Sequence, residues 1–218
     1  RYEINGSLLV PDPASRYQPS DVHGPSCVVD PNEYKWRARE WKGRPWEEVI
    51  LYELHVGTFS QEGSFESLIA YLDELSDIGF TAIELMPVSD FKGFRNWGYD
   101  GVLPFAPDSS YGSPNDLKLL IDEAHLRGLM VFLDVVYNHF GPEGNYLHTY
   151  AGDFFTDEFK TPWGKAIDFA QAQVRDFFIH NALYWIEEYC IDGLRLDAVD
   201  AIKEKNKKNI LYELAETV

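Results

Sequence analysis

Cysteine, basic side chains and long apolar runs are all scarce in this 218-residue chain. The two cysteines, Cys27 and Cys190, lie far apart without metal-ligand spacing, which argues against a disulfide framework or a zinc site and favours a reducing cytoplasm. A formal charge of −17, from 19 basic and 36 acidic residues, argues against nucleic-acid and anionic-membrane partners, because phosphate binding needs a basic face. No run approaches the roughly 18 apolar residues of a membrane span. A neutral substrate fits these absences best.

The first part of the chain differs in composition from the rest. Overall, 45% hydrophobic and 15% aromatic residues indicate a globular protein. Residues 1–47, however, hold half of the 12 prolines, which break the backbone into extended pieces and turns. Asn5-Gly6 between short apolar runs predicts a β-hairpin. We therefore interpret residues 1–47 as the last hairpin of a preceding β domain followed by an irregular connector.

Residues 48–218 alternate between strand and helix patterns. The apolar β-rich runs predict strands at 49–56, 81–88, 129–139 and 193–197. The spacing of apolar residues predicts helices at 64–79, 113–128, 174–190 and 206–218. Such alternation predicts a parallel sheet, either doubly wound or closed into a barrel, with function at the carboxyl ends of the strands. The chain has no glycine-rich nucleotide-binding pattern, which favours the barrel.

Charged residues follow two of these strands. The third predicted strand ends in "DVVYNH" (134–139), and the fourth enters "GLRLDAVDA" (193–201). Arg195 and Asp197 are two residues apart, which places them on one face of a strand. Charges in a buried strand need a partner or a chemical role. From this strand alone, a structural ion pair and a catalytic carboxylate explain the pattern equally well.

These two motifs, together with "RNWGYDGVLPFAPDSSYG" (95–112), resemble the α-amylase family of glycoside hydrolases and transglycosidases. The runs "LYELHVGTFSQEGSF" and "GLMVFLDVVYNHFGPEGNY" are similar to members that release trehalose from maltooligosyltrehalose. The resemblance implies a (β/α)8 TIM-type barrel, of which residues 48–218 are the first four βα units. It also implies a retaining mechanism on a neutral maltooligosaccharide or trehalose-type sugar. The alternatives are an α-glucan branching or debranching enzyme of the same family and a non-catalytic half-barrel.

The resemblance also implies roles for individual residues. Asp197 matches the family's catalytic nucleophile, and Arg195 matches the arginine that keeps this carboxylate ionised. Asp134 and His139 match residues that line the subsite of the cleaved sugar, and Asp134 also supports the arginine. Tyr99 matches the tyrosine whose ring packs on that sugar.

Other loop residues are weaker candidates. For Asp100 we expect a substrate contact, although ordinary loop packing explains it equally well; the same holds for Trp97, Phe140, Tyr146 and Trp163. Asn138 matches a calcium ligand of many α-amylases, but the trehalose-releasing members are not expected to rely on that ion, and we expect no metal and no cofactor. Asp200 stands where those members usually have histidine. The aromatic residues of the helix predicted at 174–190 are expected to belong to the core.

The second carboxylate of a retaining site has no match in the chain. In the family the general acid is a glutamate at the end of a fifth strand, and only four strands are predicted here. Glu213 and Glu216 fall on the last predicted helix, on the wrong side of a barrel to act as the acid. Four strands would also leave two unpaired sheet edges. We expect either a fragment of a longer enzyme, which the start without methionine favours, or a half-barrel that associates with a second copy.

Overall fold

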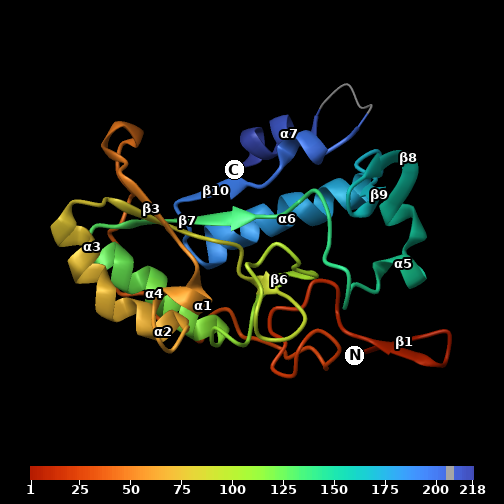
Figure 1. Cartoon of the computed structure of the whole chain (residues 1–218), viewed down its shortest axis with the longest axis horizontal. Coiled ribbons are helices and arrows are strands. Elements are labelled where there is room, and N and C mark those ends of the chain that lie inside the picture. The colour runs from red at the N-terminus through yellow and green to blue at the C-terminus, as the bar shows by residue number, and fades with distance from the viewer. Residues whose placement is uncertain (205–208) are drawn as a thin grey trace.

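The core of the structure, a computed structural model that describes residues 1–204 and 209–218, is a four-stranded parallel sheet. Its strands are β3 (Leu51–Leu54), β4 (Ala82–Leu85), β7 (Met130–Val135) and β10 (Gly193–Leu196), in the spatial order β10-β7-β4-β3. Strands adjacent in the sheet are therefore consecutive in the βα series. A doubly wound sheet would instead reverse its strand order at a switch point. The arrangement is that of a TIM-type α/β sheet, as the sequence predicts (Figure 1).

The helices cover one face of this sheet and leave the other partly open. They are α1 (Val56–Phe59), α2 (Phe65–Leu68), α3 (Leu72–Ile78), α4 (Pro114–Leu126), α6 (Ala172–Glu188) and α7 (Ile210–Thr217), whereas α5 (Leu147–Tyr150) belongs to the long loop after β7 and lies away from the sheet. Figure 1 shows α6 running alongside β7 and β10. Ile83, Leu85 and Leu133 point into the apolar core. Because strand side chains alternate, Glu84 and Asp134 belong to the opposite face.

Two predicted elements were wrong in detail. The strand predicted at 49–56 ends at Leu54, and Val56 starts helix α1. The helix predicted at 64–79 is divided into α2, the 3-10 turn η2 (Ile69–Tyr71) and α3. Apolar spacing identifies the buried side of such a segment, but it does not distinguish i−3 from i−4 hydrogen bonding. Of the helix predicted at 206–218, positions 206–208 lie outside the described residues, and α7 accounts for most of the rest.

Local signals explain where the main helices begin and end. Ser113 caps α4 by accepting a hydrogen bond from Asp116 N–H, while the Asp116 side chain accepts one from Ser113 N–H. Pro114 occupies the first helical position, where its missing N–H costs nothing. Gly79 ends α3 with a φ of 109°, a left-handed conformation that suits glycine. These signals are local, because each lies within a few residues of the helix end that it marks.

The long loops contain short sheets that the periodicity did not predict. After β4, strand β5 (Ser89–Asp90) pairs antiparallel with β6 (Leu103–Pro107). After β7, β8 (Phe155–Thr161) pairs antiparallel with β9 (Gly164–Ile167), and the 3-10 turn η3 (Gly152–Phe154) precedes them. The 3-10 turn η4 (Val199–Ala201) follows β10. These insertions place additional side chains above the carboxyl ends of the parallel strands.

The N-terminal segment begins with the predicted hairpin and then packs along the helices. Strands β1 (Tyr2–Ile4) and β2 (Leu8–Val10) pair antiparallel across a turn with positive φ at Asn5 and Gly6. The connector then runs past η1 (Trp46–Glu48) into β3. No helix among the described residues is long and apolar enough to span a membrane.

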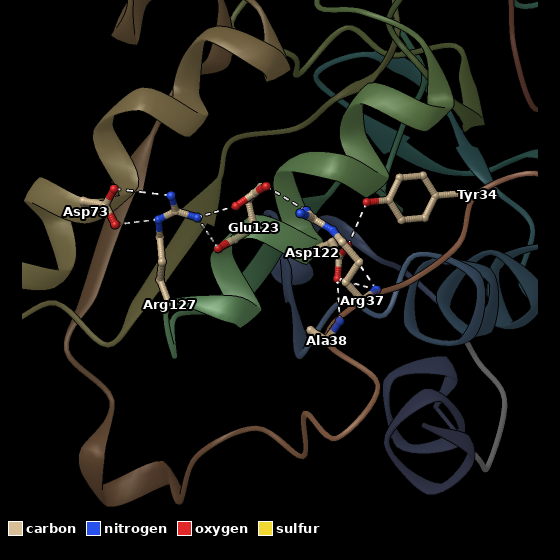
Figure 2. Close-up of polar contacts among 7 residues, drawn as sticks. All are labelled: Tyr34, Arg37, Ala38, Asp73, Asp122, Glu123 and Arg127. Atoms are coloured by element: carbon tan, nitrogen blue, oxygen red, sulfur yellow. Dashed lines mark hydrogen bonds and ion pairs between the residues drawn. The ribbon is translucent and has the colours of Figure 1, made fainter.

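Ion pairs join this connector to two helices (Figure 2). The buried carboxylate of Asp122 on α4 accepts hydrogen bonds from Tyr34 Oη, Ala38 N–H and Arg37 Nε at 2.9–3.0 Å. Burial alone would raise the pKa of Asp122, but these donors hold it below its usual range. Glu123 links Arg37 to Arg127, which in turn pairs with Asp73 on α3. The connector is thereby fixed against the helical side, away from the open face of the sheet.

Candidate active site

The predicted catalytic residues lie at the carboxyl ends of the two neighbouring strands β7 and β10. The sheet register places Arg195 directly beside Asp134, and Asp197 follows two residues later on the same face. Arg195 Nη1 lies 2.7 Å from Asp134 Oδ2 and 2.9 Å from Asp197 Oδ1. One guanidinium nitrogen therefore joins both carboxylates, and the proximity predicted for this trio is confirmed.

The two carboxylates differ in their access to solvent. The side chain of Asp134 is 0% exposed, whereas that of Asp197 is 19% exposed and that of Arg195 45% exposed. Asp134 can therefore support the arginine but cannot reach a ligand without a rearrangement. Asp197 can meet a ligand from the open face. The burial of Asp134 agrees with its predicted support of the arginine, whereas the predicted place of Asp134 in the sugar subsite finds no support in its 0% exposure.

Tyr99 completes the group from the loop between β5 and β6. Its hydroxyl donates a 3.0 Å hydrogen bond to Asp134 Oδ2, the oxygen that also accepts from Arg195. Burial, then the charge of Asp134, raises the pKa of Tyr99, so the phenol keeps its proton. Burial also raises the pKa of Asp134, against the opposing effects of Arg195 and Tyr99. Asp134 Oδ1 is buried without a hydrogen-bond partner among the residues that the structure describes.

Asn138 connects the two strand ends. Its side-chain Nδ2 donates to the carbonyls of Asp197 at 3.0 Å and Ala198 at 3.2 Å. Ala198 has a φ of 40°, a strained left-handed conformation for a residue with a Cβ. Asn138 Oδ1 contacts His139 Nδ1. The amide therefore holds the backbone turn that carries Asp197, which is a structural reason for an asparagine at this position.

His139 is buried under an aromatic ring. It is 6% exposed, and Trp163, from the turn between β8 and β9, stacks on it with a centroid distance of 4.1 Å and an angle of 10°. Burial lowers the pKa of His139, although a contact with the Tyr99 backbone and the charges of Asp197 and Asp100 oppose the shift. The imidazole thus lies beside the carboxylate group in its neutral form near pH 7.

The weaker loop candidates fall into different environments. Asp100 accepts a 2.8 Å hydrogen bond from Asn96 Nδ2 and makes no direct bond to the carboxylate group, so its substrate contact stays a prediction. Tyr146 bonds to His23 of the connector, and Phe140 packs among core phenylalanines. Ordinary packing therefore explains these two. Trp97 is 61% exposed.

The predicted core aromatics of α6 are confirmed: Phe178 and Trp185 are fully buried, Tyr184 is buried and Phe177 packs against them.

Two glutamates that the sequence analysis overlooked face the same side of the sheet. Glu53 on β3 and Glu84 on β4 are register partners, and their carboxylate oxygens lie within 4.8 Å of each other and of Asp134. A glutamate inside the apolar strands "LYEL" and "AIEL" was the available signal. Burial, then the charges of Asp134 and Glu53, raises the pKa of Glu84, and Arg195 acts against this shift. Three such carboxylates could hold a cation, but the guanidinium of Arg195, 2.7 Å from Asp134, already offsets part of their negative charge.

Glu213 of the last helix takes no part in this group. Glu213 on α7 accepts a 2.8 Å hydrogen bond from Arg175 Nε on α6, and Arg175 also pairs with Glu204. This contact lies on the helical layer, whereas Asp197 belongs to the opposite face. Glu213 was excluded as a general acid for this reason, and its position agrees with that exclusion.

Comparison with known proteins identifies the family of the chain. Residues 51–181 match the family model "Alpha amylase, catalytic domain". A malto-oligosyltrehalose trehalohydrolase from Saccharolobus solfataricus is 47% identical over 100% of this chain and 39% of its own length. A 1,4-alpha-glucan branching enzyme GlgB from Photobacterium profundum is 38% identical, over 80% of this chain and 27% of that protein. A crystal structure from Salmonella typhimurium, described as that of an alpha amylase, has a TM-score of 0.95 and 53% identity, over 97% of this chain and 36% of that one.

The chain therefore spans about two fifths of the length of the trehalohydrolase that it matches. The family model covers more than half of the present chain, including the two strands β4 and β7 and the loop with Tyr99. The resemblance drawn from the sequence motifs is thereby confirmed, and this chain belongs to the α-amylase family of glycosidases.

Proposed function

We propose that this chain carries the nucleophile side of a retaining glycosidase that cleaves the α-1,4 bond next to the terminal trehalose of maltooligosyltrehalose. The observation that carries the proposal is the contact of Arg195 Nη1 with both Asp134 and Asp197, of which only Asp197 is accessible. The similarity to a trehalohydrolase supports the substrate. Retention requires a carboxylate that attacks the anomeric carbon, and the accessible Asp197 is our candidate for this role.

The chemistry assigns each residue a task. The Asp197 carboxylate forms a bond to the anomeric carbon while the bond from that carbon to the leaving oxygen breaks. Arg195 orients Asp197 through a 2.9 Å hydrogen bond, and the buried Asp134 holds Arg195 in place. Tyr99, fixed by its hydrogen bond to Asp134, offers its ring to the apolar face of the sugar. Water then cleaves the ester, which restores Asp197 and completes hydrolysis with retention.

The leaving oxygen needs a proton, and a retaining site places the acid about 5–5.5 Å from the nucleophile. We propose that a glutamate outside these 218 residues supplies this proton, as the family resemblance implies. General acid catalysis typically contributes about 10²–10⁴-fold. The 218-residue chain by itself should therefore release trehalose from maltooligosyltrehalose only negligibly.

A substrate that needs no acid tests the nucleophile separately. In α-maltotriosyl fluoride the fluoride leaves with the bonding electron pair and requires no proton, so Asp197 alone can form the glycosyl ester. We expect fluoride release by the 218-residue chain and its loss in Asp197→Asn. Asp157→Asn, on the exposed hairpin β8–β9, is the matched control and should keep the rate. If the unmodified chain releases no fluoride above the Asp197→Asn level, the proposal fails and the non-catalytic half-barrel is favoured.

A second candidate is an α-glucan branching enzyme, which the 38% identity to the GlgB protein favours. Binding discriminates between the two without turnover. A trehalose-releasing enzyme should bind maltooligosyltrehalose more tightly than a maltooligosaccharide with the same number of glucose units. Equal affinities, together with branching of amylose by a longer form of the protein, would favour the second candidate.

A further inference from the structure

A buried chain of hydrogen bonds on the helical side of the sheet joins two segments that carry the candidate active site. The hydroxyl of Tyr137, at the end of β7, lies 2.7 Å from Asn181 Oδ1 on α6. Asn181 Nδ2 lies 2.9 Å from the carbonyl oxygen of Pro104 on β6. We refer to Tyr137, Asn181 and the Pro104 carbonyl as the Asn181 bridge. One side chain of α6 therefore connects β6 to the end of β7.

The chemistry of these groups fixes the direction of each hydrogen bond. A backbone carbonyl only accepts, so Asn181 directs its Nδ2 to Pro104 and its Oδ1 to Tyr137. The Tyr137 hydroxyl then donates to Oδ1, and burial raises the pKa of Tyr137, so the phenol keeps its proton. Asn181 is 0% exposed and Tyr137 2% exposed. Bulk water therefore does not replace a lost bond, and a buried polar atom left without its partner costs free energy.

Each end of the Asn181 bridge leads to a residue of the candidate active site. On the β7 side, Tyr137 directly precedes Asn138, whose amide donates to the carbonyls of Asp197 and Ala198. On the β6 side, Pro104 lies just after the loop between β5 and β6, which carries Tyr99. The bridge thus lies between the turn of the candidate nucleophile and the tyrosine that bonds to Asp134.

The loop that carries Tyr99 has little room to absorb a shift of β6. A Cβ added to Gly141, after β7, would lie 2.0 Å from the carbonyl oxygen of Asp100. A Cβ added to Gly98 would lie 1.9 Å from the carbonyl oxygen of Pro87, after β4. The backbone on either side of Tyr99 is therefore in close contact with two other segments. Because packed segments of this kind move together, a change at the base of the loop displaces Tyr99.

We propose that Asn181 is a positioning residue, which holds Tyr99 and the turn of Asp197 in place relative to each other from the helical side of the sheet. The inference rests on the proposed function and deepens it. An apolar side chain would fill the space at Asn181, but only a group that both donates and accepts can join these two segments. Without the bridge, we expect the 3.0 Å hydrogen bond from Tyr99 to Asp134 to lengthen.

The kinetics of fluoride release from α-maltotriosyl fluoride test this role. Asn181→Leu keeps a branched side chain without polar atoms, and we expect kcat/KM per folded molecule to fall about tenfold or more, because small displacements of reacting groups slow catalysis strongly. Tyr137→Phe loses one hydroxyl and should change kcat/KM in the same direction, and it tests the role even if Asn181→Leu does not fold. The control is Ile179→Val on the same helix, a buried substitution that should lower the unfolding temperature but keep kcat and KM.

Coupling between two variants separates positioning from simple stabilisation. Tyr99→Phe removes the hydroxyl that bonds to Asp134 and should slow fluoride release in the unmodified chain. In the Asn181→Leu background the same substitution should have a smaller effect, because the hydroxyl is already displaced. If Asn181 only stabilised the fold, the effect of Tyr99→Phe would be the same in both backgrounds.

Amide hydrogen exchange measures the positioning without a substrate. In Asn181→Leu and Tyr137→Phe we expect faster exchange of the Gly141 N–H, which donates to the Gly101 carbonyl at 3.1 Å. The N–H of Met130, at the other end of β7, donates to the Thr81 carbonyl at 2.9 Å and should keep its rate.

The outcomes distinguish this inference from the proposed function. If both variants exchange and react like Ile179→Val, the positioning role is wrong and the proposed function stands. If Gly141 exchanges faster in both variants but the unmodified chain releases no fluoride, Asn181 holds the loop as proposed and the retaining hydrolase fails.

Discussion

Arg195 on β10 donates a 2.7 Å hydrogen bond to Asp134 on β7, and the sheet register places these two residues side by side. The arginine is half-exposed and the aspartate is sealed from solvent. Burial raises the pKa of Asp134, and Arg195 and Tyr99, which face it, act against this rise and make Asp134 a suitable anchor for the arginine. The same guanidinium nitrogen then fixes Asp197, which is the accessible member. The group therefore functions as a unit.

Removing the arginine should destabilise the protein as well as inactivate it. In Arg195→Met the buried Asp134 keeps only the hydrogen bond from Tyr99, and we expect the free energy of unfolding to fall by about 2–3 kcal/mol. Urea denaturation at pH 7 measures this change. The control Lys165→Met breaks an exposed pair with Asp157 and should cost at most about 1 kcal/mol. Equal losses in the two variants would contradict the anchoring role of Asp134.

Stability should fall as the pH rises toward 9 because of Asp90. Burial, followed by the charges of Asp108 and Asp21, raises the pKa of Asp90 to about 9, against an ordinary value of 3.8. Between these values the folded state binds a proton that the unfolded state has lost, so the free energy of unfolding decreases with pH. One such group contributes up to about 1.4 kcal/mol per pH unit.

The variant Asp90→Asn removes this ionisation. We expect its free energy of unfolding to change less between pH 6 and 8 than that of the unmodified chain. Urea denaturation at several pH values measures the two slopes. Asp157→Asn, on an exposed hairpin, is the control and should keep the original slope. Parallel curves for Asp90→Asn and the unmodified chain would show that Asp90 is not the responsible group.

Trp163 should control the protonation of His139. Burial lowers the pKa of His139, and the stacked ring of Trp163 contributes to that burial. In Trp163→Ala we expect the pKa of His139 to rise toward its ordinary value, because water reaches the imidazole. NMR titration of the histidine ring protons measures the shift, with Trp46→Ala as the control. An unchanged pKa in Trp163→Ala would mean that other groups bury the ring.

Asn138 should act through the backbone of Asp197 and not through a metal ion. Its amide donates to the carbonyls of Asp197 and Ala198, so Asn138→Ala should lower the free energy of unfolding by about 1–3 kcal/mol and slow fluoride release. We expect neither calcium nor a chelator to change the unfolding temperature of the unmodified chain. A rise with calcium that disappears in Asn138→Ala would contradict this prediction and point to the calcium ligand of many α-amylases.

The 218-residue chain should associate as its concentration increases. Strands β3 and β10 are the two edges of the sheet; Leu51 on β3 is 41% exposed, and Val199 in the turn after β10 is 40% exposed. Unpaired edges with apolar neighbours favour pairing with another strand. Sedimentation velocity over a range of concentrations measures the association. We expect Leu51→Lys to reduce it; a monomer at all concentrations would contradict the prediction.

The sequence by itself determined the elements and the motifs. Asn5-Gly6 predicted the first hairpin, apolar spacing predicted the helix at 113–128 that contains α4, and the alternation of patterns predicted the parallel sheet, because each of these signals is local. The motifs around Asp134 and Asp197 indicated the family before any contact was known. The spacing of apolar residues did not reveal where the backbone changes from α-helical to 3-10 hydrogen bonding, as it does between Phe65 and Ile78.

Only the tertiary structure decided how these parts meet. Asp134 and Arg195 are 61 residues apart, and strand register, not spacing, brings them together. The grouping of Glu53 and Glu84 with Asp134 depends on the positions of three strands. The stacking of Trp163 on His139 depends on the path of the insertion that carries Trp163. Local sequence determines the spacing of apolar residues and the turns. The burial and the pKa of Asp134 and the exposure of Asp197 depend instead on what the rest of the chain places around these two residues.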